Sequence, residues 1–351
     1  MSPASLQLEY LPTAEIAARS PGWWRDVLGV VGFAKPPLID GPAPVTASMT
    51  PSLDPPNLCE VWRVAGVPDL ENGVRSGTSC HGRLRYRYCN EFLFGSVTVD
   101  EQTFDGASAE AGADALSAAT LAAYREIFEV LERTQHRHLV RIWNYLPEIN
   151  RESHGDERYR RFNSARQAAF KSCGRPTEIS VPAACALGSP AGSPVSIYFL
   201  AARAPATVIE NPRQISAYRY PPKYGRHSPT FARACVLRES GGTNFFVSGT
   251  ASIVGHETMH RGNADAQTRE TLANIEALIG EANRVVGAAR YSLEALKLKV
   301  YVREPRHLGA IKSALAERLN PGARIVYLRA DVCREELLVE IEATGESACA
   351  S

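Results

Sequence analysis

The chain has 351 residues, of which 44% are hydrophobic and 22% are charged, with 39 Lys and Arg against 38 Asp and Glu. This composition is that of ordinary globular domains, and it excludes the disordered, collagen-like and coiled-coil classes. The length favours two domains over one core, and the net charge of +1 gives no reason to expect a nucleic acid as partner. No apolar run is long enough to span a bilayer, so we expect no membrane insertion.

The cysteines and the first ten residues bear on the compartment. Eight cysteines are scattered along the chain without a close CxxC pair. Residues 1–10 lack the basic and apolar regions of a secretory signal. Both features predict free thiols and a cytoplasmic protein.

The first half of the chain alternates strand-like and helix-like segments. Seven prolines within residues 36–56 predict an extended loop, because proline donates no hydrogen bond to a sheet. Aromatic and β-branched side chains predict strands over 85–99 and 139–145, and a 3.6-residue period predicts a helix over 113–135 between them. Two further elements are expected, a helix over 158–170 and a strand over 195–202.

The second half has the pattern of an α+β unit. Its expected helices cover 265–282, with Asp265 as the N-cap, and 307–319. Its expected strands cover 231–237, 244–254, 295–302, 324–329 and 337–343. The order β-β-α-β-α-β-β predicts a mixed sheet with helices on one face.

The two halves resemble each other at an offset of about 150 residues. FLFGSVTV, a helix and LVRIWNY in the first half correspond to FFVSGTASIV, a helix and LKLKVYV in the second. We therefore predict a duplicated α+β architecture, with one domain over 1–205 and the other over 206–351.

The motif HETMH at 256–260 has the spacing of a zinc hydrolase, in which both histidines lie on one face of a helix and the glutamate is the general base. The strand-like residues before it and the loop sequence Arg261-Gly262-Asn263 argue against a helix. We therefore interpret the motif as a turn at the end of a strand, and the zinc hydrolase stays as an alternative.

A basic segment stands out between residues 203 and 233. It holds five arginines and Lys223 against a single acidic residue, Glu210, with Tyr218, Tyr220 and Tyr224 interleaved. Guanidinium groups bind carboxylates in a bidentate way and tyrosine hydroxyls add directed donors. The segment predicts a site for a small carboxylate anion, and the alternative is a solvated basic loop.

Near the C-terminal end, Glu340 and Glu342 alternate with apolar residues and are expected to share one face of a strand. A carboxyl group on a buried sheet face has a raised pKa and can act as a general acid. The alternative is a pair of glutamates facing solvent on an edge strand.

Motifs of the second half resemble the YjgF/Rid family. They are the run FVSGT at 246–250, Gln267-Thr268, the run LANI at 272–275, LKLKVYV and the closing VEIEA. The resemblance implies compact α+β domains packed in threes, with ligand sites in clefts between sheets. It also implies that Glu340, the first glutamate of EIEA, lies in the active site.

Other motifs narrow the resemblance to the chorismatases, which remove pyruvate from chorismate. They are RIWNY at 141–145 with Ile149-Asn150, Glu210-Asn211-Pro212, Tyr220-Pro221 with Tyr224-Gly225, FARA at 231–234, and Gly255-His256. The resemblance covers about residues 59–342. It implies a Rid-like C-terminal unit behind a degenerate Rid-like N-terminal unit with a proline-rich loop.

The resemblance also implies a product. Hydrolytic chorismatases, which give a dihydroxycyclohexadiene carboxylate, have alanine where this chain has Gly249 and Cys333. Members that form 3-hydroxybenzoate have glycine and cysteine there, as this chain has, and some of these also release 4-hydroxybenzoate.

From the resemblance we expect Glu340 to protonate the enolpyruvyl methylene, after which the 4-hydroxyl of the ring displaces pyruvate. Gly249 and Cys333 are expected to set how the ring sits, and neither a metal nor another cofactor is required. Chorismate is a small molecule with two carboxylates, for which the expected binding residues are Arg233, Tyr220, Tyr224 and Arg141.

Several alternatives stay open. The chain could be a hydrolytic chorismatase, or a Rid-type imine deaminase or metabolite-binding protein that uses the same cleft. It is expected to be either a trimer-like homo-oligomer or a pseudo-trimeric monomer.

Overall fold

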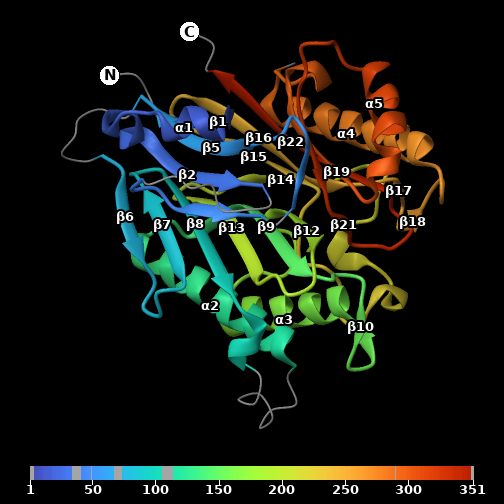
Figure 1. Cartoon of the computed structure of the whole chain (residues 1–351), viewed down its shortest axis with the longest axis horizontal. Coiled ribbons are helices and arrows are strands. Elements are labelled where there is room, and N and C mark those ends of the chain that lie inside the picture. Colours follow the sequence, from blue (N-terminus) through green and yellow to red (C-terminus); the bar gives the residue numbers. More distant parts are fainter. Residues whose placement is uncertain are drawn as a thin grey trace.

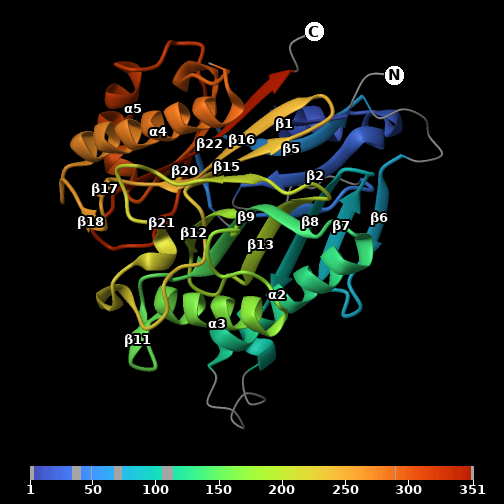
Figure 2. The same cartoon turned by 180° about the vertical axis from the view of Figure 1, so that it is seen from behind.

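The computed structural model describes residues 4–33, 41–48, 50–66, 73–104, 114–288 and 290–348. Two seven-stranded mixed sheets and one four-stranded sheet form the framework (Figure 1). Helices α2 (Ala115–Thr134) and α3 (Arg158–Ser172) cover one face of the first large sheet, and α4 (Ala264–Val286) and α5 (Leu308–Ala316) cover one face of the second. The view from behind shows the same arrangement (Figure 2). No helix among these described residues is long and apolar enough to cross a bilayer.

The first large sheet belongs mainly to the first half of the chain. Its strands, in sheet order, are β21 (Asp331–Val332), β12 (Ala183–Ser189), β9 (His138–Pro147), β13 (Val195–Ala202), β8 (Phe92–Val99), β7 (Leu84–Tyr88) and β6 (Arg75–Thr78).

The second large sheet belongs mainly to the second half. Its strands, in sheet order, are β14 (Thr207–Ile209), β15 (Ala234–Arg238), β16 (Gly242–Thr250), β22 (Val339–Ala348), β19 (Lys297–Val302), β20 (Arg324–Arg329) and β4 (Ser52–Asp54).

The two large sheets share one topology. The first unit runs β7-β8-α2-β9-α3-β12-β13, and the second runs β15-β16-α4-β19-α5-β20-β22. In each unit the last strand lies between the second and third strands, and only the third and fourth strands pair in parallel. The predicted duplication and the α+β class with helices on one face are therefore confirmed.

A third sheet is formed by residues near the N-terminus, which lie largely outside the motifs described above. Its strands are β1 (Ser5–Pro12), β5 (Leu58–Ala65), β2 (Val27–Gly32) and β3 (Val45–Ala47), with the short helix α1 (Thr13–Ala17) after β1. The strands β3 and β4 lie within the segment predicted as a proline-rich loop, so that prediction was wrong over these residues; residues 34–40 and 49 lie outside the described part.

Each half of the chain also contributes one strand to the large sheet of the other half. The strand β4 precedes residue 205 yet pairs with β20 of the second sheet, and β21 follows residue 206 yet pairs with β12 of the first. This exchange of strands ties the two units together. The division into domains over 1–205 and 206–351 stays a prediction.

The helix ends differ slightly from the predicted ones. The N-cap of α4 is Asn263 rather than Asp265, since the Asn263 side chain accepts a hydrogen bond from the backbone of Ala266. Asp114 caps α2 in the same way through Ser117. Side-chain oxygens at such positions satisfy amide groups that the first turn of a helix leaves without partners.

The inner faces of all three sheets meet in one core. Its buried side chains include Trp62 of the third sheet, Trp143 and Tyr198 of the first, and Phe246 and Tyr301 of the second. The rings of Trp143 and Tyr198 stack with centroids 4.5 Å apart. Two separate cores fill the spaces between each large sheet and its own helices.

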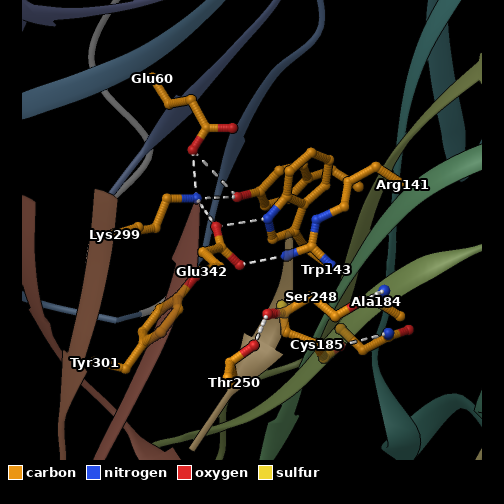
Figure 3. A network of polar contacts seen from close by, with 12 residues as sticks. Glu60, Arg141, Trp143, Ala184, Cys185, Ser248, Thr250, Lys299, Tyr301 and Glu342 are labelled. Carbon is orange, nitrogen blue, oxygen red and sulfur yellow. Dashed lines mark hydrogen bonds and ion pairs between the residues drawn. The ribbon is translucent and has the colours of Figure 1, made fainter. Parts of the chain in front are cut away.

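Buried charges lie at the centre of this three-sheet core (Figure 3). Lys299 of β19 pairs with Glu60 of β5 and, at 2.7 Å, with Glu342 of β22. Arg141 of β9 pairs with Glu342 at 2.5 Å, and the Trp143 indole donates to the same carboxylate at 2.7 Å. Two cations and two carboxylates balance, and the network joins all three sheets.

Candidate active site

The HETMH motif does not form a helix. Strands β17 (Ile253–Val254) and β18 (Glu257–Thr258) pair as a short hairpin, so His256 lies in its turn and His260 lies beyond it. The two imidazoles therefore lack the shared helix face that the zinc hydrolase geometry needs. The prediction of a turn at the end of a strand is confirmed.

A cavity of about 680 Å³ lies between the two units. Six predicted site residues line it: Glu340, Cys333, Gly249, Arg233, Tyr220 and Tyr224. The first unit contributes residues from the segment around α3, and the second contributes residues of β16, β22 and the loops beside them. The remaining lining residues are Asn150, Glu152, Gly155, Asp156, Glu157, Tyr159, Arg160, Lys223, Pro229, Phe231, Ala251, Ile253, Glu257, Arg261, Arg334, Glu335 and Glu336.

Glu340 is the buried carboxyl group of this cavity. It lies on β22 opposite Tyr301, and β22 is an interior strand between β16 and β19, so the alternative of a solvent-facing edge pair was wrong. Its side chain is 3% exposed. Burial, together with the nearby charge of Glu342, raises the pKa of Glu340 to about 8. The group is therefore mostly protonated at neutral pH and can donate a proton.

Glu342 lies two residues further along β22 and has the opposite electrostatic environment. Burial alone would raise its pKa, but Lys299 and Arg141 outweigh burial and hold the pKa below its ordinary value. Glu340 and Glu342 are thus a neutral acid and a carboxylate on one strand. Such a pair of carboxyl groups with separated pKa values is typical of acid-base sites.

Gly249 provides the space in which the Glu340 carboxyl group lies. The pairing register of β16 with β22 shifts between Val247 and Thr250, so the strand bulges at this glycine. A Cβ atom on Gly249 would overlap Oε1 of Glu340 and would lie 2.7 Å from its Cδ. Any side chain at residue 249 would therefore displace the acid.

Cys333 lies beside the acid as a neutral thiol. Burial, with a smaller contribution from the neighbouring Glu340, raises the pKa of its thiol to about 12. A thiol with this pKa is a poor nucleophile at neutral pH. Its contribution to the cavity is therefore shape rather than covalent chemistry.

Two guanidinium groups lie close to the Tyr220 ring. The ring centroid is 5.4 Å from the Arg233 guanidinium and 5.3 Å from that of Arg334. Arg233 donates through Nη2 to the Tyr220 hydroxyl at 2.7 Å and to the Ile215 carbonyl at 2.8 Å. Its Nε is buried and has no hydrogen-bond partner among the described residues.

Arg334 is held in a similar way. Its Nη1 donates to the His256 carbonyl at 2.9 Å and to Thr258 Oγ1 at 3.1 Å. Its guanidinium lies 4.1 Å from the Tyr224 ring centroid, and the Tyr224 hydroxyl donates to the same His256 carbonyl. Its Nη2 is buried without a partner within the described part of the chain. The cavity is therefore lined by two arginines that each keep one guanidinium nitrogen without a partner among the described residues, and guanidinium groups suit an anion with two carboxylates.

Comparisons with known proteins show which family the chain belongs to. Residues 60–201 match the family model described as "Chorismatase FkbO/Hyg5-like, N-terminal". A curated 3-hydroxybenzoate synthase of Streptomyces hygroscopicus is 38% identical to this chain, and the match covers 97% of this chain and 99% of that protein. This chain belongs to the chorismatase family.

Two further relatives support the assignment. A curated chorismatase of Streptomyces rapamycinicus is 35% identical, over 90% of this chain and 91% of that protein. A crystal structure of a chorismatase superposes with a TM-score of 0.83 at 31% identity, covering 98% of this chain and 99% of that one. The chorismatase fold therefore extends over nearly the whole chain.

Arg141 does not lie where we expected it in this chorismatase. It is 1% exposed, it does not line the cavity, and its guanidinium pairs with Glu342. The expectation that it holds a substrate carboxylate does not fit this position. Its positive charge instead acts on Glu340, whose pKa it lowers against the larger effect of burial.

The basic segment also divides differently from the prediction. Of its six cations only Arg233 and Lys223 line the cavity, and Lys223 pairs with Glu257. Arg213 pairs with Glu270, away from the cavity. The interpretation as an anion site therefore applies to part of the segment.

Sequence reasoning missed Arg334 and Tyr159, both of which line the cavity. Arg334 stands in the run Cys333-Arg334-Glu335-Glu336, whose net charge is negative and which has the pattern of a surface turn. Its position next to Cys333, which the family resemblance had singled out, was the one available signal.

Proposed function

We propose that this chorismatase converts chorismate to 3-hydroxybenzoate and pyruvate. The observation that carries the proposal is a protonated, buried Glu340 facing a cavity that also holds two guanidinium groups with unpaired donors. The name of the 38% identical relative, 3-hydroxybenzoate synthase, supports the choice of product.

In the proposed complex each carboxylate of chorismate pairs with one guanidinium. Arg233 and Arg334 both line the cavity, each keeps one guanidinium nitrogen without a partner in the described part of the chain, and both lie close to the Tyr220 ring. Charge-assisted hydrogen bonds of this kind hold a substrate in one orientation, which can supply several kcal/mol of the barrier. Tyr224 supports the site through its contact with Arg334.

Glu340 then transfers its proton to the methylene carbon of the enolpyruvyl group, which leaves an oxocarbenium-like ether carbon. The 4-hydroxyl oxygen attacks ring carbon 3, the bond from that carbon to the ether oxygen breaks, and pyruvate departs with this oxygen. The resulting epoxide opens and loses a ring proton to give 3-hydroxybenzoate, and a proton returns to Glu340. The composition of chorismate equals that of 3-hydroxybenzoate plus pyruvate, so no oxidant and no water is consumed.

The pH dependence of kcat/KM is the first expected result. Since Glu340 acts in its protonated form, the rate should fall as pH rises through its pKa of about 8. The measurement is initial pyruvate release at several pH values, with the carboxylates of chorismate ionised throughout. A rate that stays level to about pH 10 would contradict the role of an acid with this pKa.

Residues 249 and 333 should decide between the aromatic product and the hydrolytic one. In a variant with Gly249→Ala and Cys333→Ala, the new methyl group takes the space of the Glu340 carboxyl and the lost sulfur opens the wall beside it. We expect the product to shift toward the non-aromatic diol. Cys235→Ala, which removes a buried thiol outside this cavity, is the control. An unchanged product ratio in the double variant would remove both positions from product choice.

We also propose that the protein is a cytoplasmic monomer. Its three sheets already enclose one common core, which supports a pseudo-trimeric arrangement within a single chain. The seven cysteines within the described residues are free thiols, as suits a reducing compartment. A solution mass equal to one chain is expected from light scattering, and three times that mass would contradict the proposal.

The experiment that tests the function mixes the purified, EDTA-treated protein with chorismate and identifies the products. Pyruvate and 3-hydroxybenzoate in equal amounts are expected, with any 4-hydroxybenzoate as a minor product. Pyruvate with the diol would assign the hydrolytic reaction instead. Binding of chorismate without turnover would favour an imine deaminase or a metabolite-binding protein.

A further inference from the structure

The first and second large sheets touch where β12 meets β16, and Figure 3 shows Ser248 of β16 beside Ala184 and Cys185 of β12. The backbone amide of Ala184 donates to Ser248 Oγ at 2.9 Å, and that hydroxyl donates in turn to the Ala232 carbonyl at 2.5 Å. This contact brings Cys185 of β12 against Gly249 at the bulge of β16. It is the point at which the first unit borders the catalytic carboxyl group of the second.

Two different groups occupy the space next to Gly249. A Cβ atom there would overlap the Glu340 carboxyl, and it would also lie 2.9 Å from the Cβ atom of Cys185. The carboxyl group ends a flexible side chain and can rotate away. The Cβ atom of Cys185 cannot, because it is attached directly to the backbone of a buried strand.

The backbone of Cys185 is fixed from two directions. The strand β12 pairs in parallel with β9, placing Cys185 opposite Trp143. The side chain of Asn144 donates to the Cys185 carbonyl at 2.8 Å. Interiors this closely packed do not yield by several tenths of an ångström without loss of stability.

We propose that Cys185 is a further specificity-determining residue of this enzyme, acting by position and not by chemistry. Its Cβ atom excludes a side chain from residue 249 and so preserves the space in which the Glu340 carboxyl lies. An alanine at 249 fits without displacing the backbone of β12 only when residue 185 loses its Cβ atom and becomes glycine. The inference rests on the proposed function, since Glu340 is the acid whose place is preserved.

The sulfur of Cys185 does not explain the contact. Its pKa is raised well above the ordinary value, first by burial and then by Glu342, so the thiol stays neutral. The atom that meets residue 249 is the Cβ atom, which alanine retains. Cys185→Ala is therefore a matched control that removes the thiol and keeps the obstruction.

The test compares Gly249→Ala alone with two double variants, in which Gly249→Ala is combined with Cys185→Gly or with Cys185→Ala. The single variant Cys185→Gly completes the double-mutant cycle. We expect Gly249→Ala to lower the midpoint of thermal unfolding and the soluble yield. Adding Cys185→Gly to Gly249→Ala should recover most of the lost unfolding midpoint and soluble yield, whereas adding Cys185→Ala should not. Soluble yield gives the answer even where the single variant fails to fold.

The second readout is the products formed from chorismate. The variant with Gly249→Ala and Cys185→Gly should turn over faster than Gly249→Ala alone and should form mainly the diol, because Glu340 stays displaced. The pH above which kcat/KM of this variant falls should also differ from that of the parent enzyme. A change confined to stability would not cause this difference. Equal recovery by Cys185→Ala, or strictly additive effects in the cycle, would overturn the proposal.

The two readouts separate this inference from the proposed function. The unfolding cycle needs no substrate, so coupling between residues 185 and 249 without chorismate turnover would support the packing and reject the reaction. Turnover of chorismate with additive unfolding effects would support the reaction and reject the role of Cys185.

Discussion

Glu340→Gln should lower kcat for pyruvate release by about 10²–10⁴-fold, the range that a positioned general acid contributes. Glutamine keeps the size and hydrogen-bonding reach of the side chain but cannot transfer a proton to carbon. The arginines that face the substrate carboxylates are untouched, so KM should change by only a few-fold. Steady-state kinetics with chorismate gives both constants.

The matched control is Glu239→Gln. Burial raises the pKa of Glu239 to about 7, and this residue does not line the cavity. The control thus removes a half-buried acid of similar pKa without touching the site, and its kcat should stay within about twofold. A Glu340→Gln variant with the parent rate would remove Glu340 from the mechanism.

Lys299→Met should cause the largest loss of stability, about 3–5 kcal/mol in the free energy of unfolding. Lys299 is 2% exposed and neutralises both Glu60 and Glu342 at the centre of the three-sheet core. Without it two carboxyl groups remain buried with Arg141 as the single cation. Denaturation by urea, followed by fluorescence, measures the change.

Lys312→Met is the control for this result. Lys312 also pairs with a carboxylate, Asp54, but the two side chains are 40% and 45% exposed. Pairs of this kind contribute roughly 0–1 kcal/mol, because water already solvates both charges. Equal losses in the two variants would show that the central network does not stabilise the fold beyond an ordinary surface pair.

The elements that were predicted well have either a clear periodicity of apolar residues or a composition typical of helices or strands. The alternation in residues 295–302 and the apolar stripe of 265–282 correspond to β19 and α4, and their repetition in the first half predicted the shared topology. The strands β4 and β21 have three and two residues, too few to show a period. The exchange of strands between the units therefore could not be predicted.

The site shows the same limit. Glu340 was predictable because a strand pattern and a family motif coincide at one residue. Arg141 was assigned to the substrate because its true partner, Glu342, is 201 residues away in sequence and only folding brings the two together. Arg334 was missed because the two acidic residues that follow it make the net charge of this run negative. In the folded chain its guanidinium contacts two tyrosines of the cavity.

Turnover in D₂O tests the central claim most directly. If Glu340 protonates the enolpyruvyl methylene, each pyruvate formed carries one deuterium in its methyl group and one molecule of 3-hydroxybenzoate accompanies it. Reducing pyruvate to lactate as it forms prevents later exchange, and mass spectrometry counts the label. Singly labelled pyruvate in equal amount to 3-hydroxybenzoate is the expected result; unlabelled pyruvate, or no pyruvate at all, would contradict the account.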